Sequence, residues 1–296
     1  MSRGDLSVSV VIPTKGREQV LMDTLSSLQN QIYKPDEIIV VDQNPQPSLN
    51  ILNFLKSIPT ARHVHNQKQG LVENYNRCLK EAKGEIIIFV DDDVLVEPEL
   101  VLSHLGIYSD LTVGAVAGRV RSLKDEKNSG KSSPAAKFNR WTGQVAFEFN
   151  SPNFGIIQFA QGANMSFRRK YLLEAGGFDS KFDGNGYFFE TEAGLRLERL
   201  GFRTVFCPQA DLIHLVEKSG GARIHDKAIH TYHFTKNGIR LARRYSPKLA
   251  LPLVIINKTS YALAKALYNR NLKIFSLACK GLWEGFSGPS EFQNTL

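Results

Sequence analysis

The chain has 296 residues, of which 42% are hydrophobic and 22% are charged, enough to bury one large core and carry an appended segment. Its three cysteines, Cys78, Cys207 and Cys279, are odd in number and far apart, which argues against a disulfide framework and for a reducing compartment. The N-terminal segment has no secretory pattern, because its apolar run is short and is interrupted by Pro13. No stretch reaches the roughly 18 apolar residues of a membrane-spanning helix.

The net charge of +8 is distributed unevenly. Between Lys218 and Lys280 there are 13 Lys and Arg residues and one acid, Asp226, a local excess of +12 that leaves the rest of the chain at −4. Such a basic segment favours an anionic partner, either a nucleic acid or an anionic membrane surface. The segment lacks the interleaved aromatic residues of a single-strand binding platform, so we expect no nucleic-acid partner.

The first part of the chain alternates apolar runs with helical patterns. In order, the patterns predict a strand over 6–12, a helix over 18–30, a strand over 37–42, a short helix over 51–55, a strand over 61–65, a helix over 70–82, a strand over 86–90, a helix from about 98 and a strand over 113–120. Strands that alternate with helices are typical of a parallel sheet with helices on both faces. The sequence therefore predicts an α/β fold.

Three consecutive aspartates at 91–93 follow the apolar strand over 86–90. Ligands of open α/β sheets bind at the carboxyl ends of strands, and three neighbouring carboxylates repel one another without a counter-charge. A divalent cation that carries a phosphate would supply that charge. The alternative is a solvated turn that caps a helix near Pro98. The strand over 37–42 also ends in an acid, Asp42, so two acidic strand ends should meet at one edge of the sheet. This arrangement favours a metal site over a solvated turn.

The second part of the chain is less regular. Residues 122–139 are rich in Lys, Ser, Gly and Pro, which predicts a mobile loop that either closes over a ligand or only connects two elements. Residues 142–149 and 154–160 predict a hairpin. The patterns that follow predict a helix over 170–175, a helix from about 190, a strand over 202–207 and, after the break at Pro208, a further extended segment over 211–215.

The composition changes near residue 228, and we divide the chain into a domain over 1–217 and a basic helical extension over 218–296. Residues 239–244 and 261–267 predict amphipathic helices, and 249–256 is strongly apolar but too short to span a bilayer. Such helices either lie on an anionic membrane surface or pack on the main domain with a solvated basic face.

Four stretches, in this order, carry a specific resemblance: VSVVIPTKGR, IIVVDQN, IIIFVDDDVLVEPEL and the block GANMSFRR…GGFD…YFFETEAGLRLERLGFRTVF…H. Over residues 8–221 the sequence resembles a family-2 glycosyltransferase of the GT-A fold. The resemblance implies a Rossmann-like nucleotide-binding domain with a mixed, mostly parallel sheet. It also implies a nucleoside-diphosphate sugar as donor, with UDP as the first choice of nucleotide, a divalent cation (Mn²⁺ or Mg²⁺) and inversion at the anomeric carbon.

The same resemblance assigns candidate binding residues. Those that would bind the donor are Pro13, Thr14, Arg17, Asp42, Asp91 and Asp92. Asp42 resembles the acid that contacts the base, and residues 91–93 resemble the DxD motif, with Asp91 or Asp92 nearer the ribose. The metal ligands would be Asp93, Asp91 and His214, with Asp93 foremost.

Glu190 falls where the family carries its catalytic base, and it would take the proton from the attacking acceptor hydroxyl. The family commonly has a Glu-Asp pair there, whereas this chain has Phe189-Glu190, so Glu192 is an alternative base. We prefer Glu190, because Glu192 falls one step further into the helix that Arg196 shares. Alternatively, Glu190 has only a structural role, as an acid at the N-terminus of a helix where the helix dipole favours negative charge.

The leading hypothesis is therefore an inverting hexosyltransferase, peripheral on the cytoplasmic face of a bacterial membrane, that extends a lipid-linked or surface glycan. The basic extension would hold it on the anionic surface. One alternative is a polyprenyl-phosphate sugar transferase, which has the same donor site and a phosphate acceptor. Another is a protein that binds nucleotide sugars without catalysis.

Overall fold

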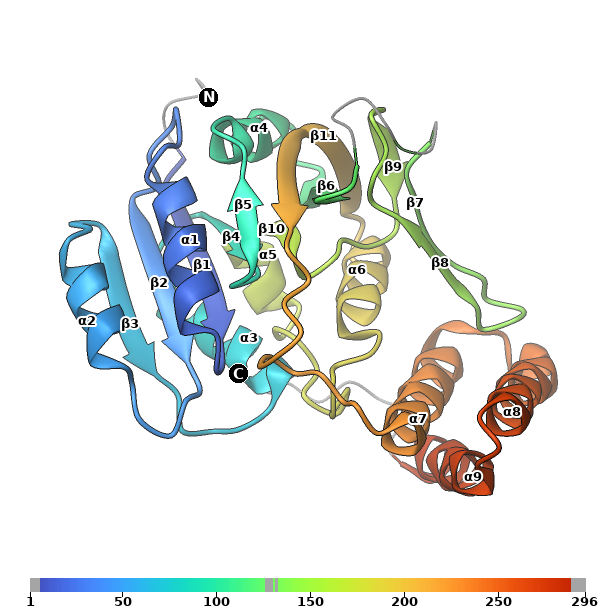
Figure 1. Cartoon of the computed structure of the whole chain (residues 1–296). Coiled ribbons are helices and arrows are strands. Elements are labelled where there is room, and N and C mark those ends of the chain that lie inside the picture. The colour runs from blue at the N-terminus through green and yellow to red at the C-terminus, as the bar shows by residue number, and fades with distance from the viewer. Residues whose placement is uncertain (1–5, 126–129, 131–132, 289–296) are drawn as a thin grey trace.

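The structure is a computed structural model that describes residues 6–125, 130 and 133–288 (Figure 1). A nine-stranded sheet has the order β3-β2-β1-β4-β10-β6-β11-β5, and β9 pairs with β11 off this path. Its strands are β1 (Val8–Thr14), β2 (Glu37–Asp42), β3 (Ala61–His65), β4 (Ile86–Val90), β5 (Val94–Val96), β6 (Val113–Ser122), β9 (Gly155–Ile157), β10 (Asn164–Arg168) and β11 (Arg203–His214). Because only β5, β9 and β10 run against the other strands of this sheet, the predicted mixed, mostly parallel sheet is confirmed.

Helices cover both faces of the sheet. One face packs against α1 (Glu18–Leu28), α2 (Leu49–Lys56) and α4 (Leu100–Ile107), and the other against α3 (Leu71–Glu81), α5 (Arg169–Glu174) and α6 (Phe189–Arg199). Alternate residues of β4 enter the two cores, since Ile88 packs on the first side and Phe89 on the second. A strand buried on both faces needs apolar residues at every position, which explains the continuous apolar run before residues 91–93.

The predicted helical extension is present as α7 (Lys227–Tyr245), a short 3₁₀ turn (Lys248–Ala250), α8 (Leu251–Tyr268) and α9 (Leu272–Ser287). The predicted helices over 239–244 and 261–267 lie inside α7 and α8, whereas α9 had no counterpart in the prediction. Ile239 and Leu241 of α7 join the same core as α6, so α7 attaches the extension to the sheet domain. Among the described residues, no helix combines the length and apolar character needed to cross a bilayer.

Two local predictions are wrong. Part of the predicted loop over 122–139 is β7 (Ala135–Phe138), which pairs with β8 (Val145–Glu148); residues 126–129 and 131–132 of that loop lie outside the described residues. The predicted hairpin between 142–149 and 154–160 does not form, because β8 pairs with β7 and β9 pairs with β11. Phe138 is buried in the core while Lys137 is exposed, and this alternation stabilises a strand despite the polar composition.

β11 continues through Pro208, where the sequence predicted a break. Its register with β6 shifts between Cys207 and Asp211, which is the kind of irregularity that accommodates a proline in a strand. The continuation carries the chain to His214, next to the end of β4.

Candidate active site

A polar cavity of about 620 Å³ opens at the carboxyl ends of β1 and β4. It is lined in part by Pro13, Thr14, Arg17, Asp91, Asp92, Gly162, Glu190, His214 and Arg223. The parallel arrangement of β1 and β4 places their carboxyl ends side by side, so the β1–α1 loop and the aspartates after β4 share one wall.

Asp92 is a buried anchor of this wall. Its carboxylate accepts hydrogen bonds from the Thr14 hydroxyl (2.6 Å) and from Nη1 of Arg17 (2.8 Å). Burial raises the pKa of Asp92 to about 6, although both partners oppose that rise. Asp92 thus fixes Thr14 and Arg17 at the edge of the cavity.

Asp91, Asp93 and His214 offer ligand atoms that all lie within 4.8 Å of one another. Nε2 of His214 is 3.2 Å from Oδ1 of Asp93 and 3.6 Å from Oδ2 of Asp91. Burial alone would lower the pKa of His214, but the two carboxylates outweigh it and raise that pKa to about 9. The cluster therefore concentrates enough negative charge to hold a proton on the imidazole.

The donor set of this cluster fits a divalent cation. Oδ2 of Asp93 accepts a hydrogen bond from the Glu217 backbone N–H (2.8 Å), whereas the buried Oδ1 accepts no hydrogen bond among the described residues and lies 3.1 Å from Nη1 of Arg17 and 3.2 Å from Nε2 of His214. A buried carboxylate oxygen beside a second carboxylate and an imidazole is a suitable start for an Mn²⁺ or Mg²⁺ site.

Arg17 also fixes the segment that follows β11. Its Nε donates to the carbonyl of Ser219 (2.8 Å) and its Nη2 to that of Glu217 (3.3 Å). The Gly221 N–H donates to the carbonyl of Lys15 (2.8 Å), which holds residues 221–225 against the cavity. Residues 221–225 lie beyond the proposed boundary at 217 yet line the polar cavity, and that boundary stays a prediction.

Asp42 lies apart from the cavity lining. Its buried carboxylate accepts from the Asn44 N–H (2.7 Å) and lies 3.2 Å from Nε2 of His63. The adjacent Gln43 lines the cavity instead. The structure therefore brings Pro13, Thr14, Arg17, Asp91 and Asp92 to the cavity, with Asp93 fully buried against the cavity-lining His214, and leaves the buried Asp42 outside the lining.

Glu190 lies in the first turn of α6, and its Oε1 accepts a hydrogen bond from the Gly162 N–H (3.2 Å). Burial, with a smaller contribution from Asp91, raises the pKa of Glu190 to about 7. Position 162 requires glycine, because an added Cβ would lie 2.8 Å from the Tyr75 hydroxyl and 3.0 Å from Oε1 of Glu190.

Glu192 has a different environment from Glu190. It is fully buried and contacts Arg196 (2.9 Å), Arg244 (3.2 Å) and the Tyr245 hydroxyl (3.0 Å). Its charge is neutralised inside the protein, and it lines neither cavity of the site. Of the two candidate bases, Glu190 is the one that faces open space.

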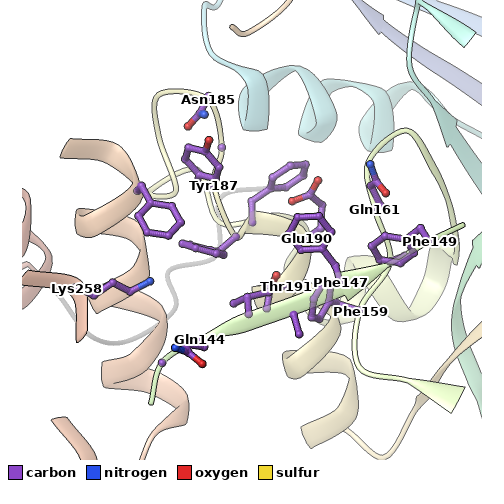
Figure 2. Close-up of a pocket in the computed structure, with 18 of the residues that line it drawn as sticks. Gln144, Phe147, Phe149, Phe159, Gln161, Asn185, Tyr187, Glu190, Thr191 and Lys258 are labelled. Carbon is purple, nitrogen blue, oxygen red and sulfur yellow. The ribbon is translucent and has the colours of Figure 1, made fainter. Parts of the chain in front are cut away.

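A second, apolar cavity of about 600 Å³ is also lined by Glu190 (Figure 2). Its aromatic walls come from β8 and the residue after it, from the segment after β9, from the loop before α6 and the start of α6, and from α7 and α8. The aromatic residues that line it are Phe147, Phe149, Phe159, Tyr187, Phe188, Phe189, Phe234 and Tyr261. Glu190 lines both cavities, so it stands where an occupant of one would meet an occupant of the other.

Residues 9–176 match the family model for glycosyl transferase family 2. The chain belongs to this family. The family 2 chain is 30% identical over 182 residues to the GalNAc(5)-diNAcBac-PP-undecaprenol beta-1,3-glucosyltransferase of Campylobacter jejuni, covering 60% of this chain and 56% of that protein. It spans about half the length of the first curated relatives it matches, 56% and 49% of them.

Solved structures agree on the fold. Mannosyltransferase PcManGT from Pyrobaculum calidifontis, in complex with GDP-Man and Mn²⁺, superposes with a TM-score of 0.57 at 18% identity, covering 96% of the family 2 chain and 76% of that structure. S. aureus TarS 1-349 in complex with UDP-GlcNAc gives a TM-score of 0.63 at 14% identity, covering 95% and 80%. The GT-A fold expected from the resemblance is confirmed.

Sequence reasoning missed several residues of the family 2 site. Tyr75 donates to Oδ1 of Asp91 (3.4 Å) or to the carbonyl of Gly162 (3.4 Å), and Arg223 places Nη2 3.9 Å from Oδ2 of Asp93. Tyr75 looks like an ordinary core residue on the apolar face of α3. Arg223 lies in a basic run that has no motif of its own, so only the position of the loop after β11 reveals it.

Proposed function

We propose that this family 2 chain is a metal-dependent inverting glycosyltransferase. It moves a sugar from a nucleoside-diphosphate sugar, with UDP as the first choice, to a hydroxyl of a lipid-linked or surface glycan. The observation that carries the proposal is the position of Glu190 between a polar cavity with a carboxylate–histidine cluster and an apolar cavity. The donor would occupy the first and the acceptor the second.

Asp91, Asp93 and His214 are the residues that would hold the cation, Mn²⁺ or Mg²⁺. When bound, such an ion offsets the negative charge on a nucleoside diphosphate as it leaves. Arg223, 3.9 Å from Asp93, adds a fixed positive charge on the same side of the cavity. The Pyrobaculum structure in complex with GDP-Man and Mn²⁺ and the S. aureus structure in complex with UDP-GlcNAc support this class of donor.

Glu190 acts as the general base. The acceptor oxygen bonds to the anomeric carbon while its proton passes to Glu190, and the bond to the diphosphate breaks on the opposite face with its electron pair. The raised pKa of Glu190, caused chiefly by burial, suits a base that works near neutral pH. Asp92 and Thr14 position Arg17 and the loop over 221–225 without taking part in proton transfer.

The donor half of the proposal is tested by nucleoside diphosphate release from a panel of nucleotide sugars, with Mn²⁺, Mg²⁺ or EDTA. We expect release with one nucleotide, and a fall of roughly 100-fold or more in EDTA or in Asp93→Ala. Asp23→Ala, an exposed acid on α1, is the matched control and should behave like the wild type. Release that is equal in EDTA and in Mn²⁺ would exclude the metal.

The same assay separates the alternatives once an acceptor is supplied. A polyprenyl-phosphate sugar transferase would form an acid-labile phosphodiester, whereas transfer to a glycan hydroxyl forms an acid-stable glycosidic bond. Tight donor binding without turnover under any metal or acceptor would favour a non-catalytic nucleotide-sugar-binding protein.

We place the protein on the cytoplasmic face of the membrane, bound peripherally through its extension. Large apolar side chains are exposed at Leu249, Leu253, Ile255, Ile256, Leu263, Leu267 and Tyr268, on or beside α8. They lie within residues 218–280, whose basic excess complements anionic lipid headgroups. The undecaprenol-linked substrate in the name of the Campylobacter relative supports a lipid-linked acceptor.

Flotation with phosphatidylglycerol and phosphatidylcholine vesicles tests this location. We expect binding to phosphatidylglycerol at low salt, release at high salt, and a weakening of roughly tenfold in Leu253→Ser/Ile256→Ser. Leu49→Ser, which removes an exposed leucine on α2, should bind like the wild type. Equal flotation of the double variant and the wild type would remove α8 from the membrane contact.

A further inference from the structure

Lys258 carries a buried cation into the apolar cavity. Its residue is 6% exposed, and Figure 2 shows the side chain extending from α8 into the cavity that Glu190 also lines. Its Nζ lies 4.2 Å from the ring centroid of Phe234 and 5.1 Å from that of Phe188. Within the described part of the chain, Lys258 has no hydrogen bond and no carboxylate partner.

A second buried lysine, in contrast to Lys258, has a carboxylate partner. Lys236 on α7 is also 6% exposed, but its Nζ lies 2.6 Å from Oδ2 of Asp183. For Lys258, burial lowers the pKa to about 8, because aromatic rings compensate only part of the lost hydration. An ammonium group kept in an apolar cavity without a carboxylate is stabilised once an anion from outside enters.

The other residues that line the cavity restrict the kind of molecule that could carry this anionic group. Aromatic rings suit a sugar ring or a hydrocarbon chain, and Glu190 requires a hydroxyl group on the same molecule. The helix that carries Lys258 also exposes Leu253 and Ile256 to the outside. An occupant that meets all of these groups would therefore combine a hydroxyl, an anionic group and an apolar part.

We propose that the apolar cavity binds the acceptor and that Lys258 recognises a phosphate of that acceptor, the group that joins a saccharide to a polyprenyl lipid. The proposal rests on the proposed function and names its acceptor class. Lys258 is then a specificity-determining residue, because it distinguishes a lipid-linked saccharide from a neutral glycan with the same terminal sugar.

Titration calorimetry with farnesyl phosphate in EDTA, without donor, tests the phosphate contact directly. We expect Lys258→Met to weaken binding by roughly 10- to 100-fold, the loss typical of a charged hydrogen bond, and Lys258→Arg to restore most of it. Farnesol, which lacks the phosphate, should bind the wild type and Lys258→Met alike. Lys248→Met removes an exposed lysine just before α8 and should leave farnesyl phosphate binding unchanged.

Three results would overturn the assignment. The first is that a Lys258→Met variant with a normal thermal transition binds farnesyl phosphate as tightly as the wild type. The second is that Lys248→Met weakens farnesyl phosphate binding as much as Lys258→Met does. The third is that only the binding of dodecyl glucuronide, and not that of farnesyl phosphate, depends on Lys258. The last result would assign the contact to a uronic-acid carboxylate. Because these measurements need no turnover, they fail independently of the donor-release assay that tests the proposed function.

Discussion

The aspartates and His214 of the polar cavity come from strand ends, whereas the apolar cavity is assembled from the β7–β8 hairpin, loops and helices that lie far apart in the chain. In the polar cavity each carboxylate has a defined partner: Asp92 holds Arg17, and Asp93 lies against His214. In the apolar cavity the Nζ of Lys258 lies beside the rings of Phe188 and Phe234 and has no carboxylate partner among the described residues. The charges of the polar cavity are therefore paired within the protein, whereas the ammonium group of Lys258 would be paired by an anionic group of a bound molecule.

Glu190 joins these two regions, and its replacement gives the largest expected effect on turnover. Glu190→Gln keeps the side-chain volume and removes the base, so kcat should fall by roughly 10²- to 10⁴-fold while nucleotide binding persists. Isothermal titration with the nucleoside diphosphate and steady-state transfer assays measure the two quantities separately.

Glu192→Gln is the matched control for Glu190→Gln, two positions along the same helix. It removes a charge that balances Arg196 and Arg244, so we expect a loss of about 3 kcal/mol in the free energy of unfolding. The folded fraction should retain its kcat. A Glu192→Gln variant that is stable but inactive would reverse the roles given to these two acids.

The sheet and the polar cavity were largely predictable from the sequence, whereas the apolar cavity was not. The sheet was predictable because buried strands such as Ile86–Val90 are continuous runs of apolar residues in the sequence. Asp91 and Asp93 follow directly from that strand, and the family resemblance supplied His214. The strand at Ala135–Phe138 was missed because Lys137 and the polar residues before it resemble a loop, and only the partner β8 makes it a strand.

The apolar cavity left no comparable signal. In the sequence Lys258 is one of many lysines of a basic segment, and its burial depends on Phe188 and Phe234 from other elements. Asp42 shows the opposite limit. The resemblance assigned Asp42 to the base of the donor, and only the structure shows that its buried carboxylate contacts Asn44 and His63 and does not line the polar cavity.

The pH dependence of transfer gives the next largest effect. Since burial raises the pKa of Glu190 to about 7, its ionised fraction should fall about tenfold for each pH unit below 7 and stay nearly constant above 8. We expect kcat/KM, measured at saturating metal between pH 5.5 and 9, to follow that curve. The residual rate of Glu190→Gln should lack the inflection, and a wild-type profile without an inflection near pH 7 in this range would show that burial does not raise the pKa of Glu190.

The smallest expected effect concerns stability and contrasts the two buried lysines. The folded-state pKa of Lys258 is lowered to about 8 from 10.5, so the unfolded chain binds the proton more tightly. Burial of the charged Lys258 therefore lowers the free energy of unfolding. This destabilisation is fully present below pH 8, disappears as the pH rises toward 10.5, and amounts to no more than about 3 kcal/mol. Lys258→Met should therefore raise the free energy of unfolding at pH 7, with a gain that shrinks above pH 8.

Lys236→Met should have the opposite sign, a loss of about 1 kcal/mol, because it removes the partner of the half-exposed Asp183. Denaturant unfolding of both variants at pH 7 and pH 10 measures the contrast. If Lys258→Met is destabilising at both pH values, the ammonium group already has a favourable environment inside the protein. Opposite signs for the two lysines would instead mean that the fold tolerates the cost of Lys258, as expected of a residue retained for an anionic ligand.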